Sequence, residues 1–306
     1  MIELPIPKNI PFMKYKVWLI LLSLVVTIGS LVIMFKNGLN YGIDFKGGVK
    51  LLYAFNAPVQ DGEIKSILLK NGVDSVVQRY GNTNRNQFTI KTKQTEETLE
   101  GSVAKITDIL TLKYGAENMV LEQQETVGPK VGQELKRKGQ LAIFFTLIAM
   151  LVYIGIKFNF YFAPGAIVAL IHDVVVVMGF LTFFNKEFNL SILAALLTIV
   201  GYSINDTIIV YDRIREHAKK INVNTIDEVV NQSINETLSR TIITSFTVLI
   251  VVAILFFSGG GVIHDFAFCF IIGVVTGSYS SIFIASPIYI WLYKHWPRIA
   301  AKFKKW

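Results

Sequence analysis

Six stretches of this chain are long and apolar enough to cross a lipid bilayer, which takes a helix of about 20 residues. They lie at 17–35, 139–156, 160–184, 190–211, 241–258 and 266–293. Backbone groups in hydrocarbon must find their hydrogen bonds inside the chain, so such stretches are expected to be helices. With 52% hydrophobic and only 17% charged residues, the composition excludes a soluble two-domain enzyme. We therefore predict an α-helical polytopic membrane protein with six transmembrane helices.

Lysine and arginine are unevenly distributed over the tails and short loops between these stretches. They gather in one alternate set, whereas the opposite set, 185–189 and 259–265, contains only Lys186. Because positively charged loops stay in the cytosol, both termini are expected to be cytosolic and the polar block between the first two stretches external. The net charge of +8 is then a topology signal rather than evidence for nucleic-acid binding. The first stretch exceeds a signal-peptide core of about 7–15 residues and is predicted to be a retained span.

The external block alternates between strand-like and helix-like patterns. Strands are expected at 49–55, 75–80, 87–92 and 118–124, helices at 59–70 and 95–114, and a turn at GNTNRN, 81–86. The order βαββαβ predicts one external ferredoxin-like α+β domain between the first and second helices.

These patterns divide the chain into four parts. They are a cytosolic N-terminus with the first helix (1–36), the external α+β domain (37–138), a bundle of helices two to six (139–293) and a basic cytosolic tail (294–306). The bundle includes a long cytosolic loop at 212–240, in which a capping box at 225–228 predicts an amphipathic helix that leads into the fifth span.

The fourth apolar stretch contains a carboxylate, Asp206, with Ser203, Asn205 and Thr207 beside it. A charge in a transmembrane segment costs about 3 kcal/mol or more and usually faces a bundle interior or an aqueous path. Arg240 opens the fifth stretch from the same side of the membrane, so the two residues are expected at comparable depth. Two interpretations remain open: an acid and a base that exchange a proton, or a helix-end cap and an arginine that extends to the lipid headgroups.

The third stretch contains a second carboxylate, Asp173, beside His172. It lies too deep to reach the membrane surface and needs a partner inside the bundle. A direct pair with Asp206 is not expected without movement, because the two differ in depth by about one and a half helical turns. A relay and a structural hydrogen bond both remain open.

The chain shows no motif for a metal, a cofactor or enzyme chemistry. Neighbouring residues such as His172 and Asp173 point about 100° apart on a helix and do not form a chelating pair. Cys269 is the single cysteine, so an intrachain disulfide and a CxxC site are excluded. P-loop, HExxH and GxSxG patterns are absent from the sequence.

Two further motifs concern backbone packing. The sixth stretch places Gly273, Gly277 and Ser281 at i, i+4 and i+8, a small-residue stripe that lets another helix approach closely. Just after the first stretch, GIDFKGG at 42–48 contains Asp44 followed by Gly47 and Gly48. Glycines there permit a sharp turn or a close backbone approach.

Together these motifs resemble the SecF members of the SecD/SecF family of protein-export membrane proteins, within the resistance–nodulation–division superfamily. The matching segments are GIDFKGG (42–48), VGPKVGQEL (127–135), His172–Asp173, GYSINDTIIVYDRIRE (201–216), NETLSRT (235–241) and GSYSSIFIASP (277–287). The resemblance implies a subunit of the bacterial cytoplasmic membrane that pairs with SecD, with the large domain in the periplasm. By the same resemblance, Asp206 and Arg240 match the acid and base of the family's proton pathway.

The resemblance also implies partners and a task. The complex would work with the SecYEG channel, with YajC and YidC as further candidate partners, and use the proton-motive force to promote export after the ATP-driven SecA step. Its other contacts would be the exported polypeptide and membrane lipid, with no nucleic acid and no cofactor. Six spans with one external domain also suit half of a pseudo-symmetric transporter.

Two alternatives and one question stay open at this point. An efflux or lipid transporter half of the same superfamily would need a substrate-lined cleft, for which one compact external domain leaves little room. A scaffold that only holds partners together would use Asp206 as a helix cap. A carboxylate with serine and threonine neighbours also suits either a proton or a sodium ion.

Overall fold

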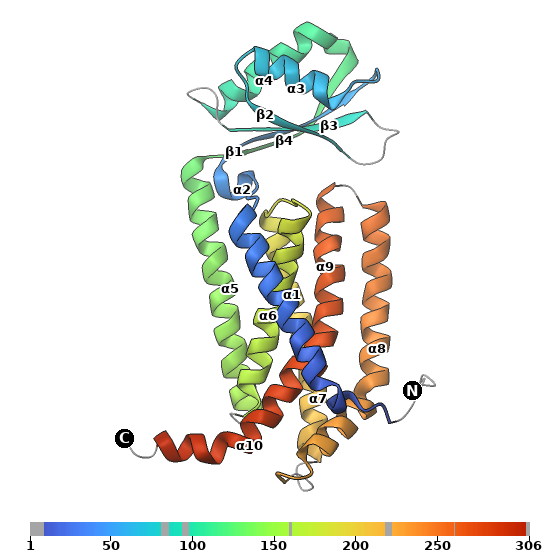
Figure 1. Ribbon diagram of the computed structural model, residues 1–306. Helices are drawn as coiled ribbons and strands as arrows, with labels where there is room; N and C mark the ends of the chain where they lie inside the picture. The colour runs from blue at the N-terminus through green and yellow to red at the C-terminus, as the bar shows by residue number, and fades with distance from the viewer. Residues whose placement is uncertain are drawn as a thin grey trace.

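The computed structural model describes residues 9–80, 86–93, 98–158, 161–217, 222–259 and 261–303, with the backbone alone for 296–303. Figure 1 shows two parts, a bundle of long helices and a small α+β domain seated on one end of it. Both chain termini lie at the opposite end of the bundle. We call the two ends of the bundle the domain end and the termini end.

Six membrane-spanning helices are present in the described part of the chain, as predicted. They are α1 (Lys16–Asn37), α5 (Pro129–Lys157), α6 (Ala163–Phe183), α7 (Leu190–Glu216), α8 (Ile226–Ser258) and a sixth span over Gly261–His295. Helices α6, α7 and the sixth span are 61%, 56% and 50% buried over their most apolar window, against 11–17% for α1, α5 and α8. The bundle therefore has a buried centre of three helices and a periphery of three that present apolar side chains outward.

Three spans differ from the predicted ranges at their ends. Helix α5 begins at Pro129 rather than 139, because a proline at the first helical position starts the helix ahead of the apolar stretch. The predicted amphipathic helix and the fifth span form one continuous helix, α8, since no proline or glycine interrupts them. The predicted start of the third span at Phe160 lies outside the described residues.

The sixth span is not a single α-helix. It consists of α9 (Gly261–Ser280), a π-helical turn η4 (Ser281–Ala285) and α10 (Ser286–Phe303). The hydroxyl of Ser286 donates to the carbonyl of Ser281 at 2.9 Å, a bond that spans the wider turn. After the turn, α10 runs sideways at the termini end of the bundle (Figure 1). The predicted basic tail, 294–306, therefore starts inside helix α10.

The α+β domain has the predicted βαββαβ order. Its elements are β1 (Gly48–Phe55), α3 (Asp61–Lys70), β2 (Ser75–Arg79), β3 (Gln87–Thr92), α4 (Leu99–Tyr114), a 3-10 turn η2 (Ala116–Asn118) and β4 (Met119–Val127). The sheet is antiparallel with strand order β2-β3-β1-β4. Of the expected turn at 81–86 only Asn86 lies within the described residues, and the expected start of α4 at Thr95 lies outside them.

Alternation along the strands decides which way the sheet faces. Val49, Leu51 and Tyr53 are completely buried and pack against α3 and α4, which cover the face away from the bundle (Figure 1). The phenol of Tyr53 lies 2.7 Å from the hydroxyl of Thr107 on α4, which satisfies its buried polar atom. Residues in between, such as Lys50, face the bundle, so this second face carries polar side chains together with Leu52 and Val76.

The glycine motif forms the joint between the two parts. A short helix, α2 (Ile43–Lys46), precedes Gly47 and Gly48, whose φ angles are +78° and +134°. A Cβ on Gly47 would lie 2.8 Å from Pro129 Cα, and one on Gly48 would lie 2.5 Å from the carbonyl oxygen of Thr92. Both positions therefore need glycine, for backbone angle and for space.

The termini end is held by polar contacts around the start of α8. The carboxylate of Asp227 forms ion pairs with Lys16 of α1 and Lys294 of α10. Asn235 contacts the backbone of Ile10, accepting from its N–H at 2.8 Å and donating to its carbonyl at 2.9 Å. A 3-10 turn, η1 (Phe12–Lys14), connects this anchored segment to α1.

Candidate functional site

Asp206 lies in the buried centre of the bundle, on α7, with only 1% of its surface exposed. Its Oδ2 accepts a hydrogen bond of 3.1 Å from the hydroxyl of Ser278 on α9. That hydroxyl also lies 2.7 Å from Ser245 of α8, which in turn accepts from Tyr202 at 3.3 Å. The other carboxyl oxygen, Oδ1, is buried and finds no hydrogen-bond donor among the described residues. One oxygen of this carboxyl group is therefore unsatisfied.

Asp173 is equally buried, on α6, but both of its oxygens have partners. Oδ1 lies 3.0 Å from Nδ1 of His172. Oδ2 accepts from the hydroxyls of Ser203 on α7 at 2.6 Å and Ser280 on α9 at 2.8 Å. These bonds connect all three central helices. The arrangement is a complete polar network of the kind that stabilises a specific packing.

Both carboxyl groups are in contact with helices α7 and α9, but in the described chain they do not bond to each other. Ser278 serves Asp206 and Ser280 serves Asp173, both from α9, while Ser203 lies one turn from Asp206 on α7. A shift of α9 against α7 would therefore disturb the partners of both carboxyl groups. The sequence analysis assigned no role to Ser278 or Ser280 and missed them as donors.

The small-residue stripe of α9 packs on α7, the helix that carries Asp206. A Cβ on Gly273 would lie 2.5 Å from Ile199, and one on Gly277 would lie 2.9 Å from Cβ of Ser203. One turn further, the hydroxyl of Ser281 lies 2.8 Å from that of Thr207. The stripe thus brings the two backbones close at three successive positions over about two turns. It ends where the π-helical turn η4 begins, and such turns often occur at functional sites.

Two predicted site residues form no hydrogen bond or ion pair with Asp206 in the described chain. Asn205 is exposed, although its neighbours on both sides of the sequence are buried. Arg240 lies on α8 with an exposed side chain, and in the described chain no ion pair or hydrogen bond joins it to Asp206. The two groups are close enough to interact electrostatically, but they do not bond in this conformation.

Asp44 of the glycine motif reaches the other end of α7. Its Oδ2 accepts from the backbone N–H of Leu190 at 2.8 Å, while Asn189 accepts from Ile192 at 2.9 Å. The first N–H groups of a helix have no partner within the helix, and a carboxylate there is favoured by the helix dipole. About 24 Å of α7 separates Leu190 from Asp206, at 1.5 Å per residue.

The α+β domain rests on the loop that leads into α7. The ring of Phe45 stacks on Phe188 with centroids 5.3 Å apart, and the N–H of Gly42 donates to the carbonyl of Phe188 at 2.8 Å. Lys91 of β3 forms an ion pair of 2.7 Å with Glu187. The start of α7 is thus bonded both to the joint and to the sheet.

In the described chain no group of three His, Cys, Asp or Glu side chains lies close enough to hold a metal ion. Asp173 is instead occupied by protein donors. The arrangement can hold or release a proton on a carboxyl group and can transmit a helix movement.

Two family models match the chain. The model described as "Protein export membrane protein SecD/SecF, C-terminal" matches residues 108–295. The model described as "SecD/SecF GG Motif" matches residues 32–59. The first match contains Asp173, Asp206 and the α9 stripe, and the second contains Asp44, Gly47 and Gly48.

Two similar proteins cover nearly all of the chain and have the same name. The chain is 39% identical to "Protein translocase subunit SecF" of Thermodesulfovibrio yellowstonii, over 96% of this chain and 98% of that protein. It is 41% identical to the protein of the same name from Desulfurispirillum indicum, over 92% and 91%.

Two solved structures share the fold. The crystal structure of SecDF, a translocon-associated membrane protein from Thermus thermophilus, aligns with a TM-score of 0.81 at 34% identity over 92% of this chain. A SecDF structure in a super-membrane-facing form aligns with a TM-score of 0.71 at 31% identity over 99%. The chain spans 38% and 41% of those two SecDF chains.

Proposed function

Because this chain belongs to the SecD/SecF family of protein-export membrane proteins, we propose that it is the SecF half of a SecD–SecF complex that promotes protein export with the proton-motive force. The family consists of translocase subunits rather than enzymes. The complex acts with the SecYEG channel after the ATP-driven SecA step, and YajC and YidC are candidate neighbours.

Pairing with SecD is supported by size and by the exposed surface of the bundle. The chain corresponds to about two fifths of a SecDF chain, and transporters of this kind are built from two related halves. Helices α1, α5 and α8 present large apolar side chains outward, among them Trp18 at 74% exposed and Phe246 at 61%. Lipid covers part of this surface and the SecD half covers the rest.

The orientation follows from the positive loops. With the termini end in the cytosol, as the lysine and arginine distribution favours, the α+β domain stands in the periplasm of a bacterial cytoplasmic membrane. The joint at Asp44 then lies at the outer membrane surface, and the Asp227 ion pairs lie at the cytosolic surface.

The observation that carries the proposal is the unsatisfied Oδ1 of Asp206. An ionised carboxylate with an unpaired buried oxygen is costly, so this conformation suits the protonated, neutral form. Release of the proton needs water or a cation at that oxygen. Arg240, exposed on the neighbouring helix α8, is the predicted candidate for that cation. Its approach to Asp206 would define the second state of the cycle.

The same helix transmits the change to the periplasm. Moving one charge through 100 mV supplies about 2.3 kcal/mol, comparable to the energy of a helix cap or an ion pair. A movement of α7 that accompanies protonation therefore suffices to shift the Asp44 and Lys91 contacts and tilt the α+β domain. Repeated tilting would pull the exported chain outward.

Export of a secreted precursor tests the proposal in cells that carry Asp206→Asn. This change preserves shape and removes the titratable group, so we expect export to fall to the level of a deletion strain while the SecD–SecF complex stays intact. Asn205→Ala, one residue away and exposed, is the matched control and should export normally. Normal export by Asp206→Asn would contradict the proposal.

The coupling ion is tested separately in membrane vesicles. A protonophore should abolish the stimulation of export, whereas collapse of a sodium gradient should leave it unchanged. The opposite result would assign the Asp206 site to sodium.

A further inference from the structure

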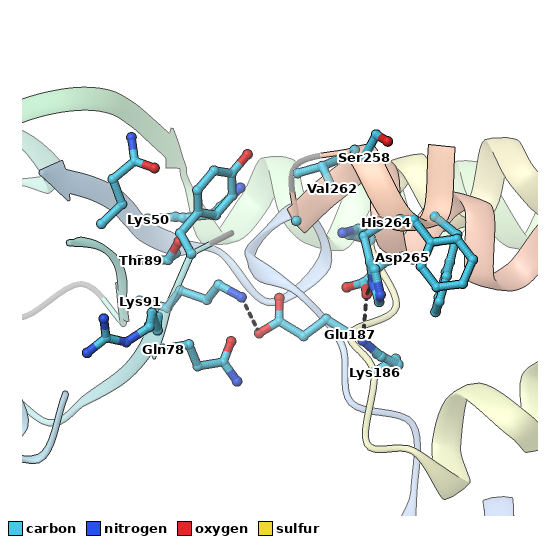
Figure 2. Close-up of a pocket in the computed structure, with 18 residues that line it drawn as sticks. Lys50, Gln78, Thr89, Lys91, Lys186, Glu187, Ser258, Val262, His264 and Asp265 are labelled. Carbon is cyan, nitrogen blue, oxygen red and sulfur yellow. Dashed lines mark hydrogen bonds and ion pairs between the residues drawn. The ribbon is translucent and has the colours of Figure 1, made fainter. Parts of the chain in front are cut away.

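A cavity of about 660 Å³ separates the polar face of the sheet from the domain end of the bundle. Figure 2 shows its two walls, with Lys50, Gln78, Thr89 and Lys91 on the sheet side and Ser258, Val262, His264 and Asp265 on the side of α8 and α9. The volume lies within the range of about 300–1,000 Å³ that is usual for ligand sites.

The α+β domain is anchored on one side of this cavity. The anchor consists of the joint at Asp44, the ion pair between Lys91 and Glu187, and the stack of Phe45 on Phe188. On the side of α8 and α9, the ring of Tyr80 lies 3.0 Å from the place where a Cβ on Gly261 would stand. A tilt of the domain about the anchor would therefore widen or narrow the cavity.

Each lysine that lines the cavity forms an ion pair, while Arg79 points to the other face of the sheet, where it donates to the carbonyl of Val59 at 3.3 Å and lies over the ring of Phe88. Lys91 pairs with Glu187 at 2.7 Å and Lys186 with Asp265 at 2.8 Å, as Figure 2 marks. Lys50 pairs with Glu125 at 2.9 Å. An anion such as a lipid headgroup or free phosphate binds to uncompensated cations, and these lysines are already occupied.

What the cavity offers instead is amide, hydroxyl and aromatic surface. The side chain of Gln78 bonds to no residue that the structure describes, and Thr89 lies beside it on the neighbouring strand. Phe257 of α8 is 80% exposed at the cavity wall. Amide and hydroxyl groups bind peptide groups whatever the sequence, and an exposed aromatic ring accepts varied apolar side chains.

The sheet also offers a free edge. In the described chain β2 pairs with β3 alone, and Gln78, Arg79 and Tyr80 at this edge line the cavity. An extended chain can add to such an edge through main-chain hydrogen bonds, with little dependence on its sequence. That is the property a binding site for many different exported proteins requires.

We propose that this cavity binds a short extended segment of the exported polypeptide, beside β2 and above Phe257. The inference rests on the proposed function in protein export, and it names where the substrate is held while the domain tilts. Because the domain is anchored on α7, the proton cycle would tilt it, and the cavity would alternately bind and release the segment.

Site-specific photo-cross-linking in the intact membrane complex tests this inference. A photo-reactive residue replaces Gln78 or Phe257, and a precursor is arrested in the channel by a folded fusion domain. The control replaces Leu112, which is 88% exposed on α4, the helix layer on the opposite face of the sheet. We expect several-fold more precursor adduct at Gln78 and Phe257 than at Leu112. Equal labelling of the three positions, adducts with lipid alone, or no adduct at the cavity would overturn the inference.

The cross-linking test of the cavity and the export test of Asp206 can fail independently of each other. If export depends on Asp206 but no precursor adduct forms at Gln78 or Phe257, the cavity assignment fails and ion coupling stands. If adducts form while Asp206→Asn exports normally, the cavity assignment stands and ion coupling fails. A bulky Gln78→Trp, compared with Leu112→Trp, adds a second readout: the first should slow export with an intact complex, and an equal effect of both would overturn the inference.

Discussion

The two carboxyl groups at the centre of the bundle are equally buried but differently bonded. Asp173 and Asp206 are each about 1% exposed. Asp173 has a partner on both oxygens, from its own helix and from two others. Asp206 has one serine donor on one oxygen and none, within the described chain, on the other. Burial alone therefore does not distinguish the two carboxyl groups; the bonding of their oxygens does.

The contact between α7 and α9 supports both carboxyl groups, so breaking it should have the largest effect. Gly277→Ala places a Cβ 2.9 Å from Cβ of Ser203, and overpacking of this kind costs about 1–3 kcal/mol. We expect lower thermal stability of the purified complex and loss of export together. Gly29→Ala, at a glycine of α1 with open space around it, is the matched control and should lower neither. Unchanged stability of Gly277→Ala would show that the close contact is dispensable.

Alanine at each carboxyl position sharpens the comparison itself. Asp173→Ala leaves the hydroxyl of Ser203 without its acceptor and Nδ1 of His172 without its partner, while Ser280 keeps the carbonyl of Gly277. Unsatisfied buried groups cost about 1–3 kcal/mol each. Asp206→Ala removes a single bond and an unpaired oxygen, so we expect little loss of stability but full loss of export. Thermal unfolding of both variants in the same detergent measures the difference. Equal destabilisation would mean that Asp206 is as structural as Asp173.

Asp44 caps the start of α7 and so links the helix that carries Asp206 to the joint with the α+β domain. Asp44→Ala removes the acceptor for the N–H of Leu190, and loss of a helix cap costs about 0.5–2 kcal/mol. We expect reduced export with an unchanged response of Asp206 to protons, since the two sites lie at different points of the helix. Asp61→Ala, at an acid in the first turn of α3, is the control. Full activity of Asp44→Ala would place the coupling elsewhere.

The smallest expected effects come from the two serine donors of α9. Ser280→Ala removes one of three donors to Asp173 and should cost about 1 kcal/mol of stability with modest change in export. Ser278→Ala removes the donor to Asp206 and should alter the pH dependence of export with little change in stability. If the two variants exchange these effects, the assignment of roles to the carboxyl groups is reversed.

The parts of the fold that hydropathy and periodicity determine were predictable from the sequence. Apolar length identified six spans, and alternation with helical spacing identified βαββαβ. The ends were less predictable: Pro129 starts α5 outside the apolar stretch, and no proline or glycine lies within the π-helical turn at Ser281–Ala285 to announce it.

The site was predictable only where a charge stood in an apolar stretch. Asp173 and Asp206 satisfy that condition, whereas Ser278 and Ser280 become recognisable as donors only from the packing of α9 on α7. The bond from Leu190 to Asp44 joins residues from opposite sides of the α+β domain in sequence, so no local pattern contains it. Arg240 was placed by depth alone, and depth does not tell which way a long side chain points.

The protonation state of Asp206 tests the central claim most directly. Infrared difference spectra of the SecD–SecF complex in lipid, recorded between two pH values with isotope-labelled aspartate, report protonated carboxyl groups. We predict a carboxyl band that titrates in the wild type and in Asp173→Asn and is absent from Asp206→Asn. A titrating band that survives in Asp206→Asn and disappears in Asp173→Asn would contradict the account, because the fully bonded carboxyl group would then be the one that exchanges the proton.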